Sequence, residues 1–250
     1  MTRLHHGVDI ASLTDRIKAG DSRAVSRVIT MLENQDLEGA AVLQNLALPT
    51  KRSIVIGITG YPGAGKSTLI DQLATVYRRQ GKKVGVIAVD PSSPNTGGAI
   101  LGDRIRMQDH SCDTGVFIRS MATRGQHGGF ARATADVIRI LEAAGYDVIL
   151  AETVGVGQDE VDVAGVVQTV VAVVAPGLGD EVQAMKAGLL EVAHILVVNK
   201  GDREGAEATV RDLKEWSPVV IRTVAVKGEG VPELIAAIAE HQRKLHRTED

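Results

Sequence analysis

The sequence predicts an α/β fold in which helices cover both faces of a mostly parallel sheet. After Pro49, short apolar runs alternate with helical patterns to the end of the chain. Aromatic residues make up only 2% of the 250 residues, so Val, Ile, Leu and Ala must form the core. Continuous runs rich in the β-branched residues Val and Ile are typical of strands buried on both faces of a parallel sheet. Repeated alternation of strands and helices implies right-handed crossover connections between parallel strands.

The first fifty residues predict an N-terminal helical segment, which we separate from a domain over residues 51–250. Apolar residues recur there at three- and four-residue spacing, and turn and cap residues stand between the periodic stretches. The expected helices are Asp9 to Lys18, Ser22 to Glu33 and Leu37 to Leu46.

In the second part, each apolar run is read as a strand and each periodic stretch as a helix. The expected strands are Ile54–Thr59, Val84–Asp90, Val116–Ser120, Val148–Glu152, Thr169–Ala175, Ile195–Asn199 and Val219–Thr223. The expected helices are Lys66–Gln80, Gly129–Ala144, Glu181–Val192, Glu204–Trp216 and Val231–Leu245. Ligands of such sheets bind at the carboxyl ends of the strands, where the motifs below lie.

Composition argues against several classes of protein. The net charge of −3 does not suit a dedicated nucleic-acid binder. A single cysteine, Cys112, excludes an internal disulfide and fits a reducing compartment. The first residues lack an apolar signal core, and no apolar run is long enough to span a membrane. We therefore expect a cytoplasmic protein without nucleic-acid or membrane partners.

The turn from Gly60 to Ser67 reads Gly-Tyr-Pro-Gly-Ala-Gly-Lys-Ser and fits the P-loop pattern G-x-x-x-x-G-K-[ST]. Backbone N–H groups of such a loop and the following helix N-terminus bind phosphate. Lys66 is expected to reach the β and γ phosphates, and the Ser67 hydroxyl to coordinate Mg²⁺. The remaining phosphate contacts are expected from Gly63, Ala64, Gly65 and Thr68. The sequence therefore predicts a P-loop NTPase.

Asn199-Lys200-Gly201-Asp202 follows a later strand and indicates which base is bound. The Asp202 carboxylate can accept hydrogen bonds from N1–H and the N2 amine of guanine, a donor pair that adenine lacks. Asn199 and Lys200 are expected to brace the phosphate loop and the base. Farther along, Ala225 and Val226 lie where a backbone N–H can contact guanine O6, although an ordinary exit from the strand explains that match nearly as well.

Three acidic residues are candidates for organising a metal and the attacking water. Asp90 ends the second strand, Asp103 lies in a glycine-rich loop, and Glu152 closes the fourth strand. Mg²⁺ prefers oxygen ligands and retains several waters, so one or two of these carboxylates suffice, directly or through water. The alternative is that Asp90 and Glu152 only cap the turns that follow them. Gly155 is the candidate backbone donor to the γ-phosphate.

These motifs resemble the MeaB/ArgK/MMAA-type GTPases, chaperones of adenosylcobalamin-dependent acyl-CoA mutases. The resemblance runs from about Ile10 to about Leu196. Its specific blocks are Gly57 to Ser67, Val89 to Ser93, Thr96 to Asp103 and Glu152 to Gln158. Asn199 to Asp202 also fits, although the family usually has Ala where this chain has Gly201.

The resemblance implies a slow GTPase that uses GTP and Mg²⁺. Its nucleotide state gates delivery of adenosylcobalamin to methylmalonyl-CoA mutase or a relative such as 2-hydroxyisobutyryl-CoA mutase. The cobalamin belongs to the mutase, and an adenosyltransferase is a second expected partner. By this resemblance Lys66, Asp90, Asp103 and Glu152 are catalytic, and Ser67 joins the three carboxylates at the metal. The stretch 177–186 resembles the family's third switch, which contacts the mutase; a simple helix-entry loop is the alternative.

The chain departs from the family pattern near its end. Members usually continue into a helical dimerisation arm, whereas this chain ends at Asp250, which leaves the mode of homodimerisation open. His194 replaces a common acidic residue and is interpreted as surface variation. A nickel-inserting GTPase is a weaker alternative because only His110 and Cys112 have close metal-ligand spacing besides a terminal His pair. Arg104, Arg106, Arg119 and Arg124 keep a small-molecule kinase as a further alternative.

Overall fold

A computed structural model describes residues 9–47, 52–90, 110, 112–122, 129–152, 165–177, 189–217 and 219–249. Seven parallel strands form one sheet in the order β3-β2-β4-β1-β5-β6-β7, which confirms the predicted α/β fold. The strands are β1 (Ile54–Gly60), β2 (Val84–Asp90), β3 (Val116–Ala122), β4 (Val148–Glu152), β5 (Thr169–Val174), β6 (Ile195–Val198) and β7 (Val220–Arg222).

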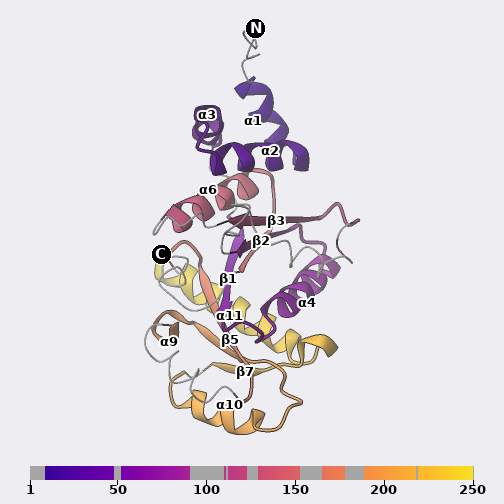
Figure 1. Cartoon of the computed structure of the whole chain (residues 1–250), viewed down its shortest axis with the longest axis vertical. Helices are drawn as coiled ribbons and strands as arrows, with labels where there is room; N and C mark the ends of the chain where they lie inside the picture. The colour runs from indigo at the N-terminus through magenta and orange to yellow at the C-terminus, as the bar shows by residue number, and fades with distance from the viewer. Residues whose placement is uncertain are drawn as a thin grey trace, which may run out of the picture.

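The helices lie in layers on both faces of this sheet (Figure 1). They are α1 (Ile10–Lys18), α2 (Ser22–Glu33), α3 (Leu37–Asn45), α4 (Lys66–Arg79), α6 (Gly129–Ala143), α9 (Leu189–Val192), α10 (Ala206–Lys214), the 3₁₀ turn η2 (Ala225–Lys227) and α11 (Val231–Glu249). Helix α11 extends beyond the predicted end at Leu245, and α10 is shorter than predicted at both ends. Of the predicted helix Glu181–Val192, the described part is α9.

Helices α1 to α3 form the outermost layer and pack on α6, at the top of Figure 1. Asp9 and Asp21 begin α1 and α2, because their carboxylates accept hydrogen bonds from backbone N–H groups of the first turns. Apolar residues of these helices share one cluster with α6 and with the sheet residues Val55 and Ile149. The division of the chain at residue 50 thus stays a prediction from sequence, although the two parts share a core.

Helices α4 and α11 cover the opposite face of the central strands. Leu69 and Leu73 of α4 and Leu234 of α11 pack with β1, β4 and β5 in a second cluster. A third cluster lies between α10 and strands β5 and β6. Because every strand is parallel, their carboxyl ends meet at one edge, where β1 passes into the phosphate loop. Within the described residues, no helix is long and apolar enough to cross a membrane.

Candidate functional site

The predicted phosphate loop joins β1 to α4, and two of its glycines are required by their surroundings. Gly60 has φ 132°, and a Cβ atom there would lie 2.0 Å from the carbonyl oxygen of Val173. Gly65 has φ 98°, and its Cβ would lie 2.3 Å from Nδ2 of Asn199. Only glycine combines these positive φ angles with such close approach. The loop conformation is therefore fixed by contacts to β5 and to the residue after β6.

Lys66 begins α4, and its side chain folds back over the loop. Its Nζ donates hydrogen bonds to the carbonyl oxygens of Gly60 (2.7 Å) and Tyr61 (3.3 Å), and the residue is only 7% exposed. Ser67 and Thr68 follow in the first turn of α4, where backbone N–H groups lack partners within the helix. The ammonium group and this helix terminus together favour an anion at the loop.

Ser67 and Glu152 bring two buried oxygen groups together beneath the loop. The Ser67 hydroxyl donates to Oε1 of Glu152 at 3.0 Å, and the exposed fractions of the two residues are 6% and 4%. Glu152 ends β4, where it pairs in register with Ile58 of β1. The carboxylate is thus engaged with the P-loop serine in addition to standing at the end of its strand.

Of the two other predicted acidic residues, the structure describes only the backbone of Asp90. The backbone of Asp90 lies two residues beyond Ala88, which pairs in register with Glu152. This register puts Asp90 at the same edge of the sheet as Ser67, but its side chain lies outside the described residues. Asp103, Gly155 and most of the stretch 177–186 lie outside them as well. Their predicted roles stay predictions.

Asn199 joins three segments that are far apart in the sequence. Its Nδ2 donates to the carbonyl oxygen of Ala64 at 2.8 Å. Its Oδ1 accepts hydrogen bonds from Oγ1 of Thr223 (3.1 Å) and from the backbone N–H of Ala225 (3.0 Å). The residue is 2% exposed, so these bonds satisfy a buried amide. The phosphate loop, the end of β6 and the start of η2 therefore form one connected unit.

The rest of the predicted base site surrounds this amide. Lys200, with φ 55°, donates from Nζ to the carbonyl oxygen of Gly63 at 2.6 Å. Asp202 lies at the surface, 3.5 Å from Nζ of Lys227, and both side chains are about half exposed. Val226 of η2 is 75% exposed beside the buried Ala225. The structure thus brings the predicted phosphate and base residues together at one edge of the sheet.

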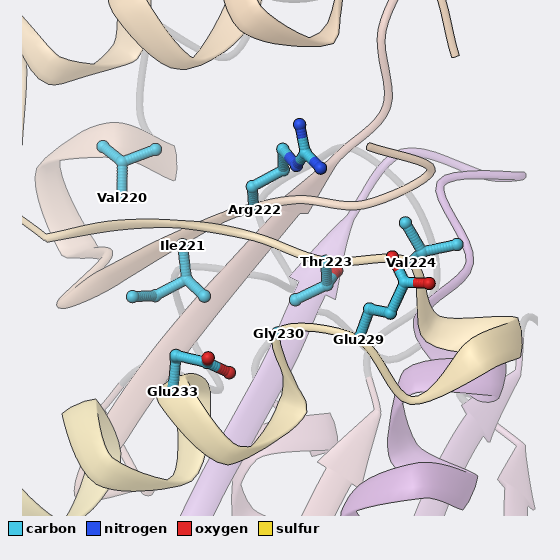
Figure 2. A pocket seen from close by; sticks show the side chains of 8 residues that line it. All are labelled: Val220, Ile221, Arg222, Thr223, Val224, Glu229, Gly230 and Glu233. Carbon is cyan, nitrogen blue, oxygen red and sulfur yellow. The ribbon is translucent and has the colours of Figure 1, made fainter. Parts of the chain in front are cut away.

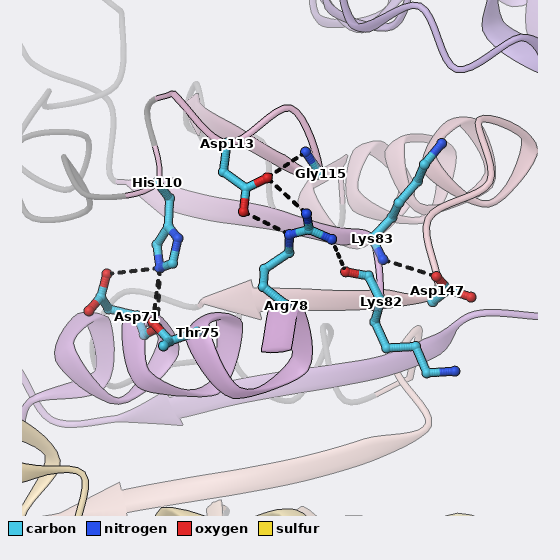
Figure 3. A network of polar contacts seen from close by, with 9 residues as sticks. All are labelled: Asp71, Thr75, Arg78, Lys82, Lys83, His110, Asp113, Gly115 and Asp147. Carbon is cyan, nitrogen blue, oxygen red and sulfur yellow. Dashed lines mark hydrogen bonds and ion pairs between the residues drawn. The ribbon is translucent and has the colours of Figure 1, made fainter. Parts of the chain in front are cut away.

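A polar stripe along α4 was missed by the sequence analysis (Figure 3). Arg78 donates from Nε and Nη2 to both carboxylate oxygens of Asp113 at 2.8 and 2.9 Å. His110, considered above as a metal ligand, instead lies 3.3 Å from the Asp71 carboxylate. The hydrogen bond from Arg78 lowers the pKa of Asp113, and the same bond raises the pKa of Arg78. The spacing of Asp71, Thr75 and Arg78 on one helix face was the available signal for this contact.

A histidine pair lies at the opposite end of β5. The rings of His194 and His241 have centroids 4.2 Å apart, tilted by 34°. Nδ1 of His194 accepts a hydrogen bond from the Val170 N–H at 2.9 Å, and Nδ1 of His241 lies 2.9 Å from Oγ1 of Thr169. Burial lowers the pKa of both rings. His194 is exposed, as the interpretation as surface variation expects, and its ring contacts His241 of α11. Within the described residues, no group of three His, Cys, Asp or Glu is arranged to hold a metal.

A cavity of about 280 Å³ borders the outer strand β7 rather than the phosphate loop (Figure 2). Residues 220–224 line one side of it. Glu229, Gly230 and Glu233 line the other side, where α11 begins. None of the predicted nucleotide-binding residues lines this cavity, so we do not assign the nucleotide to it.

Comparison with known proteins places these features in a family. Residues 25–250 match the family model described as methylmalonyl-CoA mutase-associated GTPase MeaB. A protein of Pyrococcus horikoshii is 54% identical over 252 residues, covering 96% of this chain and 80% of that protein. The GTPase ArgK of Escherichia coli is 36% identical over 254 residues, covering 94% of this chain and 77% of ArgK.

A solved structure agrees with this assignment. The crystal structure of a LAO/AO transport system kinase superposes with a TM-score of 0.74 at 29% identity, covering 96% of this chain and 76% of that chain. The family match spans the P-loop, Glu152 and the Asn199–Asp202 turn, whose geometry is described above. The protein therefore belongs to the MeaB family of P-loop GTPases and hydrolyses GTP.

Proposed function

We propose that GTP binds with its phosphates at the Lys66 ammonium group and the N-terminus of α4, and that Mg²⁺ binds at Ser67 and Glu152. The observation that carries this proposal is the buried hydrogen bond between the Ser67 hydroxyl and the Glu152 carboxylate. The hydroxyl and the carboxylate both offer oxygen ligands, which Mg²⁺ prefers, so the residues present fit the ion. When bound, Mg²⁺ would neutralise charge on the phosphate oxygens. Asp90 and Asp103 remain our candidates for completing the acidic site.

The protein's own groups then position the nucleotide. Lys66 is held above the loop by two carbonyl oxygens, so its charge is oriented before a phosphate arrives. The Asp202 carboxylate, at the surface turn, accepts hydrogen bonds from N1–H and the N2 amine of guanine. These bonds replace its contact with the Lys227 ammonium group. Asn199 and Lys200 link this turn to the carbonyl groups of Ala64 and Gly63. Base choice and phosphate position are therefore connected through two side chains.

The cellular role that we propose is guarding and loading an adenosylcobalamin-dependent acyl-CoA mutase. The description of the matched family, which names methylmalonyl-CoA mutase, supports this role. An adenosyltransferase that supplies the cofactor is the expected second partner, and the cytoplasm the expected location. The name of the similar LAO/AO transport system kinase favours one competing function, transfer of the γ-phosphoryl group to an acceptor other than water.

The test combines the purified protein with methylmalonyl-CoA mutase and, separately, 2-hydroxyisobutyryl-CoA mutase. We expect one mutase to bind the GTP-loaded protein, to accelerate phosphate release, and to receive adenosylcobalamin only while GTP is hydrolysed. Lys66→Ala should abolish the acceleration. The control is Lys83→Ala, which replaces an exposed lysine just before the first residue of β2 and should retain the acceleration. Absence of binding to both mutases would contradict the chaperone role. Transfer of labelled γ-phosphate to a small molecule would instead support a kinase.

A further inference from the structure

We propose that Arg222 is a positioning residue for guanine recognition, and that it acts through the packing of its aliphatic stem rather than through its charge. Arg222 ends β7, the outer strand of the sheet beside the Asn199–Asp202 turn. The proposal rests on the role of Asp202 proposed above. It adds a residue that contacts neither base nor phosphate in that scheme.

The first observation is the close approach of Arg222 to Gly201. A Cβ atom on Gly201 would lie 2.6 Å from Cγ and 3.0 Å from Cδ of Arg222. These atoms belong to the middle of the side chain, not to its mobile end. The stem therefore occupies the space that an alanine methyl group at position 201 would need. Gly201 and Arg222 are fitted to each other.

The second observation is that Arg222 is held from the other side as well. Gly230 has φ 77°, and a Cβ atom there would lie 2.1 Å from the Arg222 carbonyl oxygen. Figure 2 shows the Arg222 side chain pointing away from Glu233. Gly201 approaches the stem of Arg222 and Gly230 approaches its carbonyl oxygen, so the two glycines face different parts of the residue. The end of β7 is thus confined between the base-recognition turn and the turn that leads into α11.

The position of Arg222 is passed to the base site through the next residue. The Thr223 N–H donates to the carbonyl oxygen of Val198 at 2.8 Å, and the Thr223 carbonyl oxygen accepts from the Gly201 N–H at 2.8 Å. The Thr223 hydroxyl donates to Oδ1 of Asn199 at 3.1 Å. Three hydrogen bonds therefore tie Thr223 to the segment that carries Asp202. A shift of Arg222 displaces the residue to which these bonds are anchored.

The charge of Arg222 has a smaller part in this arrangement. Its Nη1 lies 2.5 Å from Oε1 of Glu207 on α10, but the two side chains are 47% and 74% exposed. Ion pairs at such exposed positions contribute little, because water already solvates both charges. Glu207→Gln is therefore a matched control that removes the ion pair and leaves the stem in place.

The experiment measures the affinity of the full chain for GTP and for inosine triphosphate, which lacks the N2 amine. The dissociation constant for inosine triphosphate divided by that for GTP measures discrimination for the N2 amine, and so reports how well Asp202 is placed. For Arg222→Ala and Gly201→Ala we expect this ratio to fall by about threefold to tenfold, as is typical for coupled neighbours. Arg222→Met, which keeps an aliphatic stem, and Glu207→Gln should both retain the parent ratio. The double variant Gly201→Ala/Arg222→Ala should be no worse than Arg222→Ala alone, since the collision is gone.

Urea midpoints of every variant show whether it is folded, and Gly201→Ala tests the contact even if Arg222→Ala does not fold. An unchanged ratio in folded Arg222→Ala and Gly201→Ala would overturn the inference. A loss in Glu207→Gln or Arg222→Met equal to that in Arg222→Ala would assign the effect to charge and overturn it too. Asp202→Asn separates the two proposals. If that variant keeps the parent ratio, the role of Asp202 is wrong; if it loses discrimination while Arg222→Ala does not, only the role of Arg222 is wrong.

Discussion

Replacing Asn199 by alanine should destabilise the nucleotide-free protein more than a typical buried polar substitution does. The amide makes three hydrogen bonds, to Ala64, Thr223 and Ala225, and is 2% exposed. Its three partners lie in the phosphate loop, after β7 and at the start of η2. The variant removes all three bonds at once and leaves two donors and one acceptor in the protein interior.

The expected magnitude follows from these contacts. Each hydrogen bond has a net value of about 0.5–1.5 kcal/mol, and each buried group left without a partner costs about 1–3 kcal/mol. Water can enter the space left by the amide and satisfy some of these groups, which favours the lower part of the range. We therefore expect the free energy of unfolding to fall by about 3–4 kcal/mol. A domain of total stability about 5–15 kcal/mol would lose a large fraction of it.

Urea denaturation followed by circular dichroism measures this loss. Thr223→Val removes one of the three bonds and should cost about 1 kcal/mol. Asn45→Ala is the surface control, since Asn45 is exposed and bonds only locally to Ala41, and should change stability by less than about 0.5 kcal/mol. If Asn199→Ala stays within about 1 kcal/mol of the parent, the amide does not hold the three segments together and the reasoning is refuted.

Three further predictions concern the loop and the histidine pair. Lys66→Ala should reduce GTP hydrolysis about 100-fold or more, because it removes a preorganised cation; steady-state phosphate release checks this, and near-parent turnover would contradict it. Gly65→Ala should lower the free energy of unfolding by about 1–3 kcal/mol, because it puts a Cβ at φ 98° and 2.3 Å from Nδ2 of Asn199. An unfolding temperature equal to that of the parent protein would contradict this. Burial lowers the pKa of His194 and His241 from 6.5, so the unfolded chain binds more protons at acidic pH. Stability should be fully present above about pH 6.5 and fall as the pH drops below it, and urea midpoints between pH 5 and 8 should show a weaker fall in His194→Gln.

The strands were predictable because their apolar character is local. Val148–Glu152 was predicted with the bounds that the structure has, and it is a continuous run buried on both faces. The order of strands in the sheet was not predictable in the same way, because it depends on which helix crosses over which strand. Helix ends were less certain: α11 continues through polar residues past Leu245, where apolar periodicity no longer marks it. Local pattern thus gives the elements, and packing sets their neighbours and ends.

In the candidate site, too, local motifs were predictable from the sequence, whereas contacts that depend on the fold were not. Gly60 to Ser67 and Asn199 to Asp202 were predicted from motifs, since binding of phosphate and of guanine would each require a fixed spacing of residues. The hydrogen bond from Asn199 to the carbonyl oxygen of Ala64 agrees with the expectation that Asn199 braces the phosphate loop. The contact between Arg78 and Asp113 spans 35 residues and was not predicted, because no motif specifies that spacing and the contact depends on how the chain folds back. The roles of Asp90 and Asp103 stay predictions of the sequence.

The proposed base and phosphate sites are linked by hydrogen bonds and form one mechanical unit. Asn199 and Lys200 donate to the carbonyl groups of Ala64 and Gly63, which point away from a bound phosphate when the loop N–H groups point toward it. Holding these carbonyl groups therefore sets the direction of the N–H groups. Under the proposed function, a guanine bound to Asp202 would restrain the same turn from which Asn199 and Lys200 extend. Under the proposed function, recognition of the correct base should then strengthen the contacts that already hold the phosphate loop, so that discrimination is expressed at the phosphates as well as at the base.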